Sequence, residues 1–173
     1  MSKKVISFSL NAGSINKAIL ELEQYARDFQ EKVDNYRKRI AEEIAGSASL
    51  NFGSAVIDDR IRDGFRKPDV QVSVSDSGDI SVVVAEGEDA IWCEFGAGVY
   101  HNGSAGGSPN PYGKELGFTI GSYGKGYGKR SAWGYYEDGE LVITRGTPAS
   151  MPMYNAAQEV TKKAIDIARE VFG

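Results

Sequence analysis

The chain has 173 residues, 41% of them hydrophobic and 25% charged, with a formal net charge of −4. This length fits one domain, and this balance argues against a disordered tail or a globally basic nucleic-acid binder. No apolar run approaches the roughly 20 residues of a membrane span, and the start of the chain does not read as a signal peptide. The lone cysteine, Cys93, excludes an intrachain disulfide and a cysteine-rich zinc site, so we expect synthesis in a reducing cytoplasm.

The first predicted element is a short strand. Ile6, Phe8 and Leu10 alternate with serines, and a period of two is typical of a half-buried strand. Asn11-Ala12-Gly13 ends this pattern, and Ser14 is the expected cap of the helix that follows.

The strongest periodic signal is a stripe of apolar residues at helical spacing. It predicts a helix of about 30 residues, roughly 45 Å long, that ends near Gly46. The favoured interpretation is that the stripe packs across the domain's own sheet. Alternatively, a helix of this length overhangs the domain and leaves part of its stripe for a neighbouring subunit, as in a coiled coil. The nine residues of the apolar stripe are Ile15, Ile19, Leu22, Ala26, Phe29, Val33, Tyr36, Ile40 and Ile44.

The rest of the chain predicts two hairpins and a final helix. Residues 46–67 are ambiguous and could form a second short helix. Alternating valines on both sides of a turn at 76–79 predict a hairpin over 70–85, and Asp138-Gly139 predicts the turn of a second hairpin over 133–144. From about 150 to 172 the spacing is helical again, with Pro152 tolerated in the first turn. We expect a single α+β domain spanning 1–173, with a long N-terminal helix and a C-terminal helix packed on a mainly antiparallel sheet.

A long glycine-rich loop interrupts this pattern at about 96–131. Between Gly96 and Gly128 lie 11 of the 21 glycines, and four basic residues face one acid, so the insertion is locally basic. It could lie against a phosphate backbone, or it could order only against a neighbouring protein. The residues that would make such a DNA or partner contact are Lys114, Tyr123, Lys125, Tyr127, Lys129 and Arg130.

The same segment fails as a phosphate-binding loop. The Gly128-Lys129 pair lacks the required glycine five residues earlier, where Tyr123 stands. Arg130 also occupies the place of the Ser or Thr that would hold magnesium.

No catalytic constellation is evident. A thiolate–imidazole pair of Cys93 and His101, the only histidine, would be the obvious nucleophile. Cys93 lies in an apolar run with Ile91 and Trp92, however, so we expect a buried structural thiol, and His101 is expected at the surface. We therefore expect neither an enzyme nor a metal, cofactor or small-molecule substrate. The acidic clusters are interpreted as solvated charge: Asp58, Asp59 and Asp63 near Arg60 and Arg62, and Glu86, Glu88 and Asp89.

Two short motifs carry a resemblance to a known family. The segment 91–98 has an Ile-Trp-Cys-Glu-Phe-Gly-Ala-Gly sequence, and 146–153 reads Gly-Thr-Pro-Ala-Ser-Met-Pro-Met. Together with the aromatic hairpin at 133–136 and the amphipathic N-terminal helix, they resemble a tailed-bacteriophage morphogenesis family. Its members are tail-completion, neck and minor tail components, and the resemblance covers essentially the whole chain.

The resemblance implies candidate residues for fold maintenance or partner contact, of which fold maintenance is favoured. Phe95 is expected to dock at the end of a short helix or turn, and Gly96 to permit a left-handed exit. The two prolines would rigidify the entry to the last helix, and the methionines would offer adaptable apolar contact. The family-signature residues are Glu94, Phe95, Gly96, Gly98, Pro148, Met151, Pro152 and Met153.

By resemblance, the expected role is mechanical. Several copies, expected to be six, would form a ring at the head–tail junction or tail terminus of a virion, in contact with other connector and tail proteins. DNA would pass through the ring, and a net-acidic subunit suits this passage because a strongly basic lumen would bind the genome. The competing hypothesis is a nucleic-acid-binding module that uses the basic Tyr/Gly-rich loop.

Overall fold

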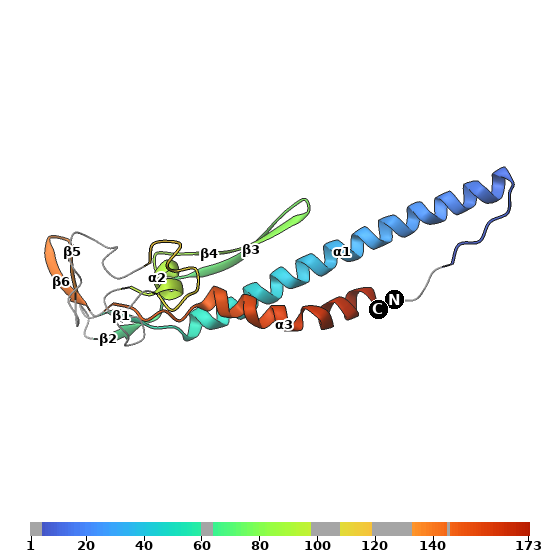
Figure 1. The fold of residues 1–173 in the computed structure, drawn as a ribbon. Helices are drawn as coiled ribbons and strands as arrows, with labels where there is room; N and C mark the ends of the chain where they lie inside the picture. The colour runs from blue at the N-terminus through green and yellow to red at the C-terminus, as the bar shows by residue number, and fades with distance from the viewer. Residues whose placement is uncertain (1–4, 60–63, 98–107, 119–132, 145) are drawn as a thin grey trace.

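The computed structural model describes residues 5–59, 64–97, 108–118, 133–144 and 146–173. The molecule is elongated: two helices lie side by side, and the first extends well beyond the second (Figure 1). The elements in chain order are α1 (Ala12–Ser54), β1 (Ile57–Asp59), β2 (Gly64–Arg66), β3 (Gln71–Ser77), β4 (Ile80–Glu86), α2 (Ala90–Phe95), β5 (Trp133–Glu137), β6 (Glu140–Thr144) and α3 (Pro152–Phe172).

Helix α1 is longer than predicted. Its 43 residues, about 65 Å, begin after Asn11, whose Oδ1 accepts a hydrogen bond from the backbone N–H of Ser14, so Asn11 and not Ser14 is the cap. The predicted end at Gly46 and the separate short helix after it are both wrong. Ala48 and Phe52 are buried, and their packing outweighs the low helix propensity of an exposed Gly46.

The predicted N-terminal strand is not formed. Residues 5–10 have no strand partner in the described part of the chain, and Val5, Phe8 and Leu10 are exposed. A period of two therefore describes an extended segment here, because the apolar side chains have no sheet on which to pack.

Helix α3, predicted from its periodicity, runs along the second half of α1. Its last aromatic residue, Phe172, packs against the rings of Phe29 and Tyr36. Tyr36 also donates its hydroxyl hydrogen to the carbonyl oxygen of Ala164, and Asn51 Nδ2 donates to the carbonyl of Pro152 near the other end of the pair. Residues of α1 before Phe29 extend past the end of α3, and we call residues 12–28 the overhang.

The β3–β4 hairpin, predicted from alternating valines, packs against the other side of α1. Val72 and Val74 pair with Ala85 and Val83 on the face toward the helix. Gly78, at φ +57°, supplies the positive φ that the tight turn requires.

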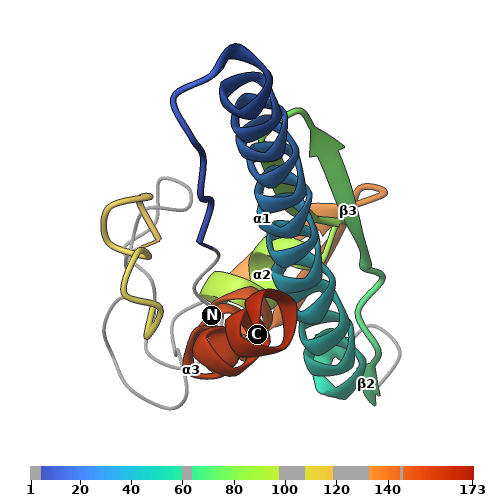
Figure 2. The same ribbon diagram turned by 90° about the vertical axis from the view of Figure 1, so that its right-hand side faces the viewer.

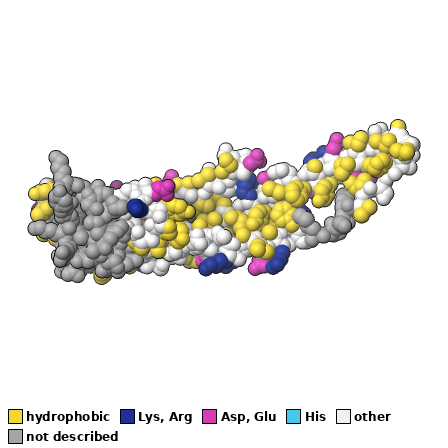
Figure 3. Space-filling model, viewed as in Figure 1, with side chains coloured by type: hydrophobic (Ala, Val, Ile, Leu, Met, Phe, Trp, Pro, Cys, Tyr) yellow, Lys and Arg dark blue, Asp and Glu magenta, His cyan; other side chains and the backbone are white. Residues whose placement is uncertain are grey.

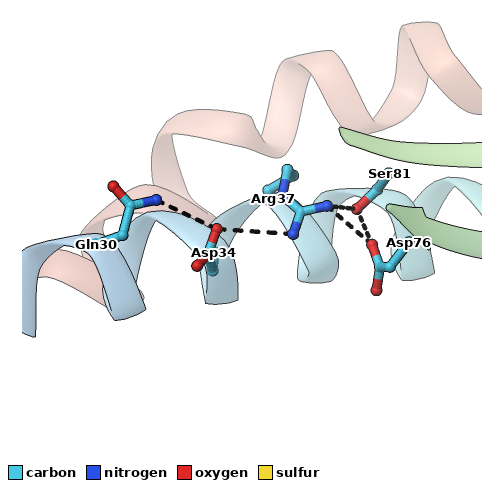
Figure 4. Close-up of polar contacts among 5 residues, drawn as sticks. All are labelled: Gln30, Asp34, Arg37, Asp76 and Ser81. Carbon is cyan, nitrogen blue, oxygen red and sulfur yellow. Dashed lines mark hydrogen bonds and ion pairs between the residues drawn. The ribbon is translucent and has the colours of Figure 1, made fainter. Parts of the chain in front are cut away.

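One arginine ties this hairpin to the helix. Arg37 Nη1 donates to Asp76 Oδ1 at 2.9 Å and to the hydroxyl of Ser81, while Nη2 lies 3.7 Å from Asp34 Oδ1. Asp76 also accepts from Ser81, so one guanidinium joins α1 to both strands (Figure 4). The hydrogen bond from Ser81 is the largest influence on the pKa of Asp76, which lies below its ordinary value.

The predicted α+β class is confirmed. In the described residues the strands form three antiparallel pairs, β1–β2, β3–β4 and β5–β6, rather than one continuous sheet. The Asp138-Gly139 turn has φ of 50° and 85°, as the sequence predicted for the second hairpin. The β1–β2 pair was not predicted, because three-residue strands carry too little pattern to recognise.

The core lies where the C-terminal end of α1, the base of the β3–β4 hairpin and α2 meet. Phe52, Ala55, Ile57 and Cys93 form its buried centre. Four partly buried residues pack against this centre: Val70, Val72, Ala85 and Met153.

The apolar stripe of α1 is only partly enclosed. Figure 2 shows α1 between α3 on one side and β3 on the other, and in this part of the helix Val33, Ile40 and Ile44 of the stripe are only partly buried. In the overhang the stripe is exposed, and hydrophobic side chains run along that end of the molecule (Figure 3). Packing across the domain's own sheet therefore accounts for only part of this helix. Among the described residues, no helix combines the length and hydropathy that crossing a membrane would require.

Candidate functional site

The site is a buried joint between α2 and the first turn of α3. Glu94 Oε2 accepts a hydrogen bond from the backbone N–H of Met153 at 2.8 Å, and Oε1 accepts from Tyr154 N–H at 3.0 Å. A third bond, from Asn110 Nδ2 to Oε1 at 2.8 Å, ties in the described part of the glycine-rich insertion. One carboxylate thus joins three segments of the chain.

The chemistry of the α3 terminus explains this arrangement. The first N–H groups of a helix lack partners within it, and a side-chain acceptor at the cap position normally satisfies some of them. The cap residue here is Met151, which has no such acceptor, and Pro152 has no N–H. Glu94 supplies the missing acceptor from elsewhere in the sequence, and its negative charge suits the positive end of the helix dipole.

Burial raises the pKa of Glu94 above its ordinary value. The three donors act in the opposite direction, because each favours the charged form, but they do not cancel the cost of burying the carboxylate. The side chain is 9% exposed, so water competes little for these hydrogen bonds.

The backbone beside Glu94 makes a second set of contacts. The carbonyl of Cys93 accepts hydrogen bonds from the N–H groups of Ser150 and Met151, and Ala97 N–H donates to the carbonyl of Thr147. Met151 adopts a left-handed conformation, φ 52° and ψ 51°, in which the chain turns into α3. The two segments that carry the family resemblance therefore lie against each other over several residues.

Ring contacts extend the joint into the insertion. Phe95 stacks on Phe118 with ring centroids 4.3 Å apart, and Tyr112 meets Tyr154 edge-on at 6.3 Å. The expected docking of Phe95 is confirmed, and its partner comes from the insertion. Gly96 follows at φ +79° and ψ 163°, so its φ is positive as expected, but its conformation lies outside the left-handed helical region that was predicted for the exit from α2.

Asp89, interpreted from the sequence as solvated charge, is instead buried. Its carboxylate accepts two hydrogen bonds from Arg66, at 2.5 and 2.8 Å, and one from the backbone N–H of Asp69. Burial alone would raise the pKa of Asp89, but these donors and the charge of Arg66 outweigh it and the pKa lies below its ordinary value. Asp89 thereby connects β2 and the residues just before β3 to the start of α2. Arg66 and Asp89 are 23 residues apart in the sequence, too far for local patterns to predict the ion pair.

Cys93 is a buried thiol, as its apolar neighbours predicted. Burial raises its pKa to about 11, with the nearby charge of Asp89 acting in the same direction. A thiol held protonated is a poor nucleophile at neutral pH.

The remaining candidate residues are placed as follows. Pro152 is fully buried, Met153 packs against the core, and Pro148 is exposed. Lys114 is exposed on the described part of the insertion. The other predicted residues lie outside the described residues: Gly98, His101, Tyr123, Lys125, Tyr127, Lys129 and Arg130.

The joint is suited to holding segments in place. Both oxygens of Glu94 and the carbonyl of Cys93 are engaged by neighbouring backbone groups. No group of three or more metal-ligating side chains occurs in the described ranges. Asn110 and the Asp89–Arg66 pair are the parts of the joint that sequence reasoning missed, since no local signal marks an interaction between distant segments.

Comparison of the chain with protein-family models, curated proteins and solved structures finds no match.

Proposed function

We propose that this chain is a structural subunit of the head–tail junction of a tailed bacteriophage, where it assembles into a ring through which DNA passes. The observation that supports this function is the joint itself. The two segments resembling phage tail-completion and neck proteins are distant in the sequence, yet Glu94 bonds directly to residues 59 and 60 positions later, in the first turn of α3. They form one packed unit, as motifs of a common fold are expected to do.

The shape of the molecule supports a subunit role. A long helix extends beyond the domain and exposes a regular apolar stripe (Figures 1 and 3). Large exposed apolar surfaces on proteins are typical of contacts with other proteins or membranes. A subunit of an assembly would bury such a surface in its contacts with neighbouring subunits.

Inactivating the gene in its phage tests this function. Electron microscopy of the lysate should show heads and tails that are not joined, and a plasmid copy of the gene should restore infectious particles. Normal yields of infectious particles without the protein would contradict the proposal.

Titration with duplex DNA at low and high salt addresses the competing nucleic-acid-binding function. Tight binding that is lost when Lys114, Lys125, Lys129 and Arg130 are changed to Glu would favour that alternative. If the protein is a junction subunit, these substitutions should leave any weak DNA binding and its salt dependence largely unchanged.

A further inference from the structure

The overhang of α1 presents an apolar ridge. Ile15, Ile19 and Leu22 lie on one face at spacings of four and three, and they are 38 to 56% exposed. We call this face, with Ala26, the ridge. No other described helix or strand lies beside it (Figures 1 and 2). Most of the stability of a helix in a protein comes from packing of its apolar face, so a packing partner would stabilise the overhang.

Further along the same helix, the stripe becomes the floor of a groove. Val33, Ile40 and Ile44 lie between walls that include Val83 of β4 and Ala164 of α3. The groove has a volume of about 400 Å³ and is lined mainly by apolar groups. It opens along the side of the molecule that α3 and the hairpin flank but do not cover.

The ridge and the groove are matched in chemistry and length. From Val33 to Ile44 the groove follows α1 for about 16 Å, and from Ile15 to Ala26 the ridge also extends for about 16 Å. A helix whose apolar face lies in an apolar groove is a common mode of protein recognition. The two surfaces belong to one continuous helix, so the ridge cannot fold back into the groove of its own molecule.

Charge also favours a second copy of this chain as the occupant. Beside the ridge, the overhang carries Lys17 and Arg27 among Glu21, Glu23 and Asp28, a mixture without the positive block that a nucleic acid or an anionic membrane surface requires. Arg37 also lines the groove, and its side chain is 18% exposed. Acidic side chains flank the ridge, so the charges of the two surfaces are complementary.

From these features we infer that the ridge of one copy docks in the α1–α3–β4 groove of the next copy. This contact is heterologous, because it joins two different surfaces and leaves a free ridge and a free groove at the ends of each open assembly. Such a contact closes into a ring or continues as a filament, according to the rotation that it imposes. The inference rests on the proposed function as a ring subunit and names the surfaces that would form the ring.

Complementary mixing of two variants of the full chain tests the inference. Leu22→Glu places a charge on the ridge and leaves the groove intact. Thr161→Arg fills the groove and leaves the ridge intact. Thr161 is an exposed residue of α3 that lines the groove, and its hydroxyl donates to the carbonyl oxygen of Ala157 in the same helix. Circular dichroism and thermal unfolding should be unchanged in both variants.

The expected result is measured by size-exclusion chromatography with light scattering. The wild-type protein should form oligomers at high concentration, and each variant alone should associate at least about tenfold more weakly. An equal mixture should form a dimer with one copy of each, because one intact ridge and one intact groove remain. Leu20→Glu is the matched control: Leu20 is 63% exposed, but it lies two residues from Leu22 and so on the opposite face, and this variant should assemble like the wild type.

Three outcomes would overturn the inference: a wild-type protein that stays monomeric at every concentration, a Thr161→Arg variant that assembles normally while Leu22→Glu does not, or a mixture without the mixed dimer. The second outcome would show that ridges pair with ridges. The phage function is tested separately. If the variants form mixed dimers but virions stay intact after gene inactivation, the junction role is wrong and the contact is retained. If mixed dimers do not form but gene inactivation leaves heads and tails unjoined, only the contact is wrong.

Discussion

Glu94 and Met153 are 59 residues apart in the sequence, and Glu94 Oε2 accepts the backbone N–H of Met153 at 2.8 Å. Through this bond and the neighbouring one to Tyr154, a side chain of α2 caps α3, whose own cap residue cannot do so. The first turn of α3 is therefore stabilised only when α2 is correctly placed, so the folding of α2 and the folding of α3 are coupled.

Replacing Glu94 with Ala should lower the free energy of unfolding by about 2 to 4 kcal/mol. The substitution leaves the N–H groups of Met153 and Tyr154 and the amide of Asn110 without their buried acceptor. Urea denaturation measures the change. Glu88→Ala, at an exposed glutamate nearby, is the control and should unfold almost like the wild type. A loss below about 0.5 kcal/mol for Glu94→Ala would show that the capping is not important for stability.

The contribution of Glu94 should also depend on pH. Its pKa in the folded protein is raised above the ordinary value of 4.5. The folded state therefore binds the proton more tightly than the unfolded state, and the resulting stabilisation is fully present below pH 4.5 and is lost as the pH rises through the folded pKa. The free energy of unfolding of the wild type, relative to Glu94→Gln, should be greater at pH 4 than at pH 7. If the wild type instead became more stable relative to Glu94→Gln as the pH rises from 4 to 7, the raised pKa of Glu94 would be contradicted.

Arg37 should hold the tip of the β3–β4 hairpin against α1. In Arg37→Met the long apolar stem is retained and the bonds to Asp76 and Ser81 are lost. Hydrogen exchange at the tip, residues 75–82, should become faster, while the base of the hairpin near Val72 and Ala85 should keep its protection because it packs on the core. Arg169→Met, which removes an exposed ion pair with Asp166 on α3, is the control and should leave the hairpin unaffected. Equal acceleration at tip and base would indicate general destabilisation instead.

The thiol of Cys93 should be almost unreactive in the native protein. With its pKa raised from 9.0 to about 11, the thiolate fraction at pH 8 falls about a hundredfold, and burial further blocks access. Labelling with a thiol reagent should be slow in buffer and should reach one thiol per chain in denaturant. Rapid labelling of the folded protein would support a reactive cysteine and reopen the thiol-enzyme hypothesis.

Local patterns in the sequence were sufficient for most of the elements. The stripe of α1, the Asp138-Gly139 turn and the alternating valines each predict their structure, because helical spacing, positive φ and strand alternation are properties of a few neighbouring residues. The same reasoning failed at Gly46 and at residues 5–10. The helix α1 continues beyond Gly46 because burial of Phe52 stabilises its last turns. Residues 5–10 form no strand because the described structure contains no sheet against which Phe8 could pack.

The long-range contacts were decided only by the tertiary structure. The sequence by itself determined that α1 carries an apolar stripe along one face, and that a second helix begins near Pro152. It could not determine that Glu94 caps α3, that Asp89 is buried on Arg66, or that α3 and the hairpin flank the stripe and leave a groove. These features depend on how distant segments pack, and the free energy of that packing comes from burial and from satisfying polar groups across the whole chain rather than from neighbouring residues.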